Sequence, residues 1–69
     1  LLEAQLKGAK LQRANFEETD LMWANLEGAN LENTKLDGAC LQGANLKGTR
    51  IKKVQIELAF LDEDTQLPD

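Results

Sequence analysis

Large aliphatic or phenylalanine side chains recur at every fifth residue along almost the whole of this 69-residue sequence. They occupy twelve consecutive positions without a gap: Leu6, Leu11, Phe16, Leu21, Leu26, Leu31, Leu36, Leu41, Leu46, Ile51, Ile56 and Leu61. Two residues before each stands a smaller one, usually Ala or Thr, from Ala4 through to Ala59. Any fold proposed for this chain must therefore satisfy a period of five.

This period suits neither a regular helix nor a flat strand. On an α-helix, steps of five residues rotate by about 140°, which would scatter the leucines around the circumference. On a flat strand, an odd step sends successive leucines to opposite faces. A chain that turns one corner per repeat can instead point every Leu and every preceding Ala into one interior. Four corners close a square coil of about twenty residues, so we expect about three coils.

The repeated units also carry a family resemblance. Ala-Asn-Leu-x-x and Ala-x-Leu-x-Gly units at 14–18, 24–28, 29–33, 39–43 and 44–48 resemble the pentapeptide-repeat family. The resemblance covers residues 4–63. It implies an all-β solenoid, a right-handed quadrilateral parallel β-helix of about three coils of four pentapeptides, with a short C-terminal capping segment. Val54 is large for its interior slot and Phe60 stands in an outward slot that is usually polar, so we expect an irregular last coil.

The end of the repeat predicts where the solenoid stops. We expect the solenoid to cover residues 1–63 and a cap or tail to cover 64–69, because the last layer of a solenoid must be shielded from water. Leu67 is expected to fold under the final coil, with Pro68 blocking further strand pairing.

Two further apolar residues, Leu58 and Phe60, flank the last coil. We expect them to close the C-terminal end together with Leu67 in preference to contacting a partner. The sequence starts at Leu1 with no initiator Met, so we expect that it is processed or truncated, which is compatible with an earlier loss of a targeting segment. No cap is visible before Leu1; upstream residues, a cap or a partner would cover that end, and an uncapped N-terminal coil would permit self-association.

Small and amide residues mark the expected corners. Gly8, Gly28 and Gly48 are spaced so that they would stack in one column, at corners where a positive φ or a close backbone approach is needed. The asparagines that precede a central Leu or Phe are expected to hydrogen-bond the backbone of the turns: Asn15, Asn25, Asn30 and Asn45. Both groups are interpreted as structural.

The composition excludes most catalytic chemistry. There is no His and no Tyr, so the usual general base near neutral pH is missing and Cys40 has no imidazole partner. One Cys without His cannot build a structural zinc site, and Cys40 is interpreted as a small filler. Carboxylates are the only plentiful titrating groups and would suit a hard cation. We expect no enzyme activity, no cofactor and no catalytic residue.

Stacking at a spacing of twenty converts the sequence into surface columns. Lys7, Glu27 and Lys47 alternate in sign, whereas Glu17, Asp37 and Glu57 form an all-acidic column. Like charges stacked directly destabilise a sheet, so this acidic column is a candidate site for a divalent cation or a basic partner, although plain solvation explains it as well. The neighbouring side is basic, with a single acid, Glu32: Lys10, Arg13, Arg50, Lys52 and Lys53.

Met22 and Trp23 occupy the outward positions of one repeat. Their neighbours one coil on are Gln42 and Gly43, followed by Asp62 and Glu63. An exposed Trp is a common interface anchor, which favours a partner-binding surface. Alternatively, the indole lies over Gly43 and covers bare backbone.

Three functions from different classes remain. The first is a non-catalytic scaffold or protein-interaction module with an unidentified protein partner. The second is a DNA-mimicking protein that acts on gyrase or another topoisomerase, as some acidic members of the family do. Residues 1–56 carry seven acids and eight bases, and only the last thirteen residues are strongly acidic, with five acids and no base. A DNA mimic should be negative along its length, so we favour the scaffold. The third, an enzyme, would need a further domain.

The sequence gives less information about binding partners and cellular compartment. The basic side has no aromatic platform, so we expect no nucleic-acid binding. No apolar run reaches the ~20 residues of a membrane span, so we expect a soluble chain with no membrane contact, in a compartment that these residues do not define.

Overall fold

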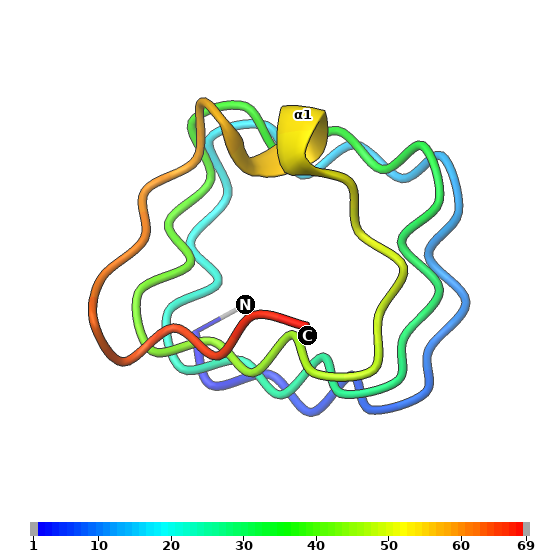
Figure 1. Cartoon of the computed structure of the whole chain (residues 1–69), viewed down its shortest axis with the longest axis horizontal. Coiled ribbons are helices and arrows are strands. Elements are labelled where there is room, and N and C mark those ends of the chain that lie inside the picture. Colours follow the sequence, from blue (N-terminus) through cyan, green and yellow to red (C-terminus); the bar gives the residue numbers. More distant parts are fainter. Residues whose placement is uncertain (1, 69) are drawn as a thin grey trace.

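A computed structural model describes residues 2–68, and in it the chain winds into stacked coils with a four-sided outline (Figure 1). Leu1 and Asp69, the outermost residues of the two predicted segments, lie outside the described part. Parallel bridges join residues twenty apart, including Gln5 with Asn25 and Asn25 with Asn45. The coil of about twenty residues that the period predicted is therefore present.

The bridges are isolated, and no continuous strand forms among residues 2–68. Each corner closes through a hydrogen bond between residues three apart, as from Ala9 N–H to Leu6 O at 3.0 Å. Because a corner follows every five residues, each side has room for a single bridged residue between two turns. The expected all-β architecture is thus seen as a ladder of single bridges, with one helical turn, α1 (Lys53–Ile56).

The last residue of each repeat has a positive φ at every corner from 3 to 48. A positive φ at the third residue of a four-residue turn, with none at the second, is typical of a type II turn and favours Gly or Asn. Five of these corners carry glycine, and the others carry Glu3, Arg13, Glu18, Trp23 and Asn33. Gly28 and Gly48 lie one above the other, since a Cβ on Gly48 would come 3.4 Å from Gly28 N. Of the predicted column of Gly8, Gly28 and Gly48, the last two are therefore in contact, whereas a Cβ on Gly28 would meet no atom of Gly8 within 4 Å.

The core lies inside the coil, where the period placed it. The six leucines at the central positions of residues 21–46 are at most 1% exposed: Leu21, Leu26, Leu31, Leu36, Leu41 and Leu46. The small residues two before the last five of them are also buried, from Ala24 to Ala44, and the hydroxyl of Thr34 donates to Leu11 O at 2.8 Å. The hydroxyl of the other buried threonine, Thr49, donates to Leu46 O at 2.7 Å, so each leucine packs in a layer whose two buried hydroxyls are both satisfied.

The four predicted asparagine contacts are all present. In each, the side-chain oxygen accepts the N–H two residues on, at 2.9–3.1 Å: Asn15 to Glu17, Asn25 to Glu27, Asn30 to Glu32 and Asn45 to Lys47. Asp20 does the same for Met22 at 3.1 Å. These contacts stabilise the entry to each corner locally.

The last coil departs from the repeat, as the sequence led us to expect. The register assigned Val54 to the interior, but Val54 is 66% exposed because it lies in α1. Here the ladder opens, and the side-chain Nε2 of Gln55 donates to Leu31 O and Thr34 O at 2.8 and 3.0 Å. A side chain thus replaces the backbone contacts that the coil would otherwise make.

The ladder resumes after α1 in the regular register, with Cys40 bridging Phe60, and shifts at the next bridge. Asn45 bridges Gln66, twenty-one residues on, so the final turn contains one additional residue. Gln66 belongs to the predicted cap, and the boundary at 63/64 stays a prediction. The three side chains expected to close this end remain open to solvent, with Leu58, Phe60 and Leu67 at 66%, 57% and 41% exposure. Over residues 2–68, no helix has both the length and the apolar character that crossing a membrane requires.

Candidate functional site

Trp23 lies directly over Gly43, one coil further along. A Cβ added to Gly43 would come within 2.5 Å of the indole atoms Cδ2 and Cε3, so the ring covers this glycine closely. The Trp23 side chain is nevertheless 51% exposed. The two interpretations of Trp23 are thus compatible, because the indole covers backbone on its inner side and meets solvent on its outer side.

Backbone hydrogen bonds between coils position the turn that carries this ring. Trp23 has a φ of 61°, and its N–H donates to Gln42 O at 2.9 Å. On the next coil, Gly43 N–H donates to the Asp62 carboxylate at 3.0 Å. Met22 is half-buried beside the ring, so Trp23 is the more exposed member of the predicted pair.

Together these residues belong to one side of the coil, which we name the Trp face and define by the outward side chains of 2–3, 20–23, 40–43 and 60–63. Bridges from Asp20 to Cys40 and from Cys40 to Phe60 hold the three coils of this side in register. Leu2 and Phe60 are exposed on it at 57% each. Its four ranges contain acids and no Lys or Arg.

The predicted acidic column is only partly assembled. Glu17 and Asp37 line one hollow together with Glu18, Gly38 and Leu58. Glu57 is the C-cap of α1, and Gly38 N–H donates to Leu58 O, so Leu58 takes the backbone place that a regular ladder would give to Glu57. Within residues 2–68 no group of three or more His, Cys, Asp or Glu side chains is placed to hold a metal ion. Partner binding by these acids stays a prediction.

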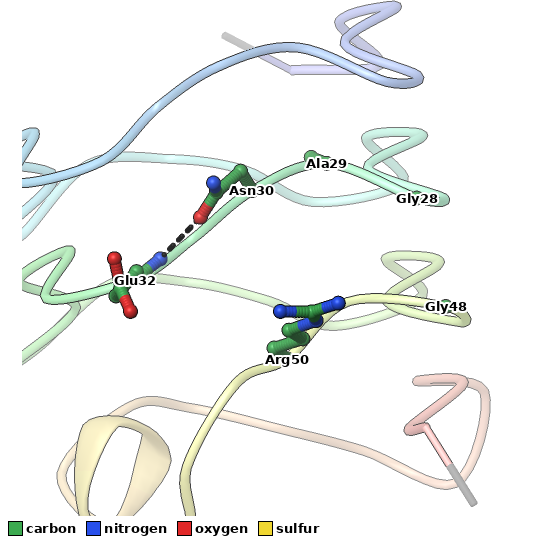
Figure 2. Close-up of a pocket in the computed structure, with 6 residues that line it drawn as sticks. All are labelled: Gly28, Ala29, Asn30, Glu32, Gly48 and Arg50. Atoms are coloured by element: carbon green, nitrogen blue, oxygen red, sulfur yellow. Dashed lines mark hydrogen bonds between the residues drawn. The ribbon is translucent and has the colours of Figure 1, made fainter.

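A second hollow, of about 410 Å³, marks the place where the ladder opens (Figure 2). Gly28, Ala29, Asn30 and Glu32 line it from one coil, and Gly48 and Arg50 from the next. Lys10 bridges Asn30, but no bridge continues the column from Asn30 to Arg50 in the described part of the chain. The ion pair that the structure records over residues 2–68 is Lys7 with Glu27 at 4.0 Å, in the column of alternating sign.

Two features escaped the prediction. The opening between Asn30 and Arg50 follows from α1, for which the period of five gives no signal. Glu3 was the other: Asp62 and Glu63 were placed beside Trp23 from the sequence, and the same spacing of twenty also puts Glu3 in the column of Trp23 and Gly43. Cys40 is a partly buried free thiol on the same side.

Comparisons with protein-family models and with solved structures both find proteins that this chain resembles. The family model "Pentapeptide repeats" matches eight copies, over residues 1–22 and 14–52. The crystal structure of the pentapeptide repeat protein Rfr23 from the cyanobacterium Cyanothece 51142 is 32% identical, with a TM-score of 0.87 over 94% of this chain. The match covers 44% of that protein, so this chain spans less than half of its length. No curated protein matches the chain.

Proposed function

The chain belongs to the pentapeptide-repeat family, and from this premise we propose that it is a non-catalytic scaffold that binds a protein partner through the Trp face. The architecture that we infer for it is a right-handed quadrilateral β-helix of about three coils with a C-terminal capping segment. A rigid coil of this kind offers ordered side chains on four sides and a filled interior. We therefore expect the outer surface of the coil to bind the partner.

One observation carries the proposal: Trp23 is 51% exposed although its ring is fixed over Gly43. An indole held in one orientation contributes area to an interface with little further loss of conformational entropy. The chain has one Trp, and it lies on the Trp face together with the exposed Leu2 and Phe60. Exposed apolar groups gathered on one side of a domain are typical of interaction surfaces.

The experiment compares Trp23→Ala with a matched control, Leu58→Ala. Leu58 is 66% exposed and lies outside the Trp face. We expect Trp23→Ala to change the free energy of unfolding by about 1 kcal/mol or less but to abolish self-association or capture of a partner by the immobilised chain. Leu58→Ala should leave association intact. Denaturant unfolding and sedimentation of the same preparations separate the two effects, and association unchanged by Trp23→Ala would end the proposal.

A further inference from the structure

We infer that the Trp face binds a basic peptide segment, with a Lys or Arg side chain over the free side of the Trp23 indole. This inference rests on the proposed function, because it names the chemistry of the partner that the same face would bind.

The first argument is the geometry of the indole. Gly43 occupies one side of the ring, and the side chain as a whole is 51% exposed. The turn sets the backbone from which the ring projects, with a φ of 61° at Trp23, and the contact with Gly43 sets the side of the ring that is covered. A guanidinium or ammonium group binds over the face of an indole better than over any other aromatic ring, and it needs one accessible face.

The second argument is the charge around the ring. Glu3, Asp20, Asp62 and Glu63 are exposed on the Trp face, and its ranges contain no Lys or Arg. The basic side of the coil lies elsewhere, at Lys10, Arg13, Arg50, Lys52 and Lys53. An acidic surface favours a cationic partner and disfavours a polyanion such as nucleic acid.

The third argument is the placement of those acids along the stack. Glu3 precedes the ring by one coil, and its N–H donates to Met22 O at 2.9 Å. On the other side, the Asp62 carboxylate accepts from Gly43 N–H at 3.0 Å, and Glu63 follows it. Acidic residues therefore stand on the coils before and after the indole, where they can pair with successive cations of an extended peptide.

The acidic surface around Glu17 and Asp37 has charge but no aromatic ring. Glu17, Glu18 and Asp37 line their hollow with Gly38 and Leu58, and no aromatic side chain is among these residues. It can attract a cation by charge alone. We therefore expect tighter binding on the Trp face, where charge and an aromatic ring act together.

The test uses the chain as its own reporter, because Trp23 is its only Trp. The probe is a peptide in which Arg alternates with Gly and Ser, compared with the same peptide carrying citrulline in place of Arg. Citrulline keeps the approximate shape of Arg but has no charge, and its ureido group has three N–H donors and a carbonyl acceptor where the guanidinium has five N–H donors. We expect the Arg peptide to change the Trp emission saturably and the citrulline peptide to have no such effect.

Variants then locate the site by fluorescence anisotropy of a labelled Arg peptide. Trp23→Leu, and separately Glu3→Gln with Glu63→Gln, should each weaken binding by roughly 2- to 30-fold. The control removes two exposed acids elsewhere, Glu18→Gln with Glu32→Gln, and should change the affinity by less than about twofold. The paired Gln variants alter no packing contact of the ring, so they remain informative even if Trp23→Leu folds poorly.

Several outcomes would overturn the inference. If the citrulline peptide binds as tightly as the Arg peptide, the positive charge of Arg does not contribute to binding. If the control pair weakens binding as much as Glu3→Gln with Glu63→Gln, the peptide is attracted by the net charge of −4 of the whole chain and not by the Trp face. Self-association that Trp23→Leu abolishes, without peptide binding, would make a second copy the occupant and leave the proposed function standing. Unchanged association of every kind in the Trp23 variants would remove both.

Discussion

The indole of Trp23 and the backbone of Gly43 form a direct contact between neighbouring coils, because a Cβ at Gly43 would come within 2.5 Å of the ring. The residue that leaves space for the ring is therefore twenty positions away from it in the sequence. This contact links the repeat to the surface, since the same glycine that closes a corner also sets the position of the exposed indole of the Trp face.

Substitution of Gly43 by Ala tests this contact against backbone strain. Gly43→Ala must place a methyl group against the indole at a φ of 73°, whereas Gly28→Ala meets no atom within 4 Å at a φ of 71°. We expect about 1–2 kcal/mol of destabilisation for Gly28→Ala from the left-handed conformation, and about 1–3 kcal/mol more for Gly43→Ala from overpacking. Denaturant unfolding measures both, and a shifted Trp emission should accompany Gly43→Ala alone. Equal losses for the two would contradict the contact.

The core predicts a strong contrast between inside and outside. Leu26→Ala or Leu46→Ala should lower the free energy of unfolding by about 2–5 kcal/mol, because each leaves a cavity in a closed layer. Lys7→Ala should cost well under about 1 kcal/mol, since its ion pair with Glu27 is long, at 4.0 Å, and exposed. Chemical denaturation of the three variants gives the comparison, and similar losses for all would refute the interior assignment.

Gln55 should be the residue that ties the last coil to the one before it. Its amide donates to Leu31 O and Thr34 O, and its oxygen accepts from Lys52 N–H at 2.8 Å. Gln55→Ala should therefore lower stability by about 1–3 kcal/mol. Hydrogen exchange should quicken in 50–57 and hardly change in 5–30. Gln55→Glu keeps the acceptor but loses the donors, so it should retain only part of the stability; full stability would contradict the role of the donors.

Asp62 should stabilise the backbone of Gly43, which the indole covers. Its carboxylate accepts from Gly43 N–H at 3.0 Å and from Asp64 N–H at 3.0 Å. We expect Asp62→Ala to cost about 1–3 kcal/mol, and Asp62→Asn to cost less because the amide oxygen still accepts. Asp64→Ala is the control, since over residues 2–68 no hydrogen bond to the Asp64 carboxylate is recorded, and its effect should stay within about 0.5 kcal/mol. Thermal unfolding followed by circular dichroism distinguishes these variants.

The rival function makes its own prediction. The excess of acid over base in this chain lies in the last thirteen residues, with five acids and no base, whereas residues 1–56 hold seven acids and eight bases. A mimic of duplex DNA should present negative charge along its whole length. We therefore expect no protection or inhibition of gyrase at micromolar concentrations in a supercoiling assay, and clear protection would restore the DNA-mimic hypothesis.

The sequence by itself determined the coil, its interior and the contacts within each turn. When a large residue stands at every fifth position, a coil with one corner per repeat can bury all of them in one interior. The structure buries the central leucines from Leu21 to Leu46 in this way. The asparagine contacts were predictable for the same kind of reason, because each spans two residues and depends on local conformation alone.

The tertiary structure alone decided the last coil and the surroundings of Trp23. Val54 satisfies the spacing but lies outside in α1, and Gln66 pairs one residue out of register with Asn45. Whether a late segment follows the repeat depends on contacts with residues twenty positions away, which local preference does not encode. The position of the indole has the same origin: the turn fixes its backbone, but Gly43 on the next coil leaves the space that the ring covers, and only the stacking of the coils brings the two together.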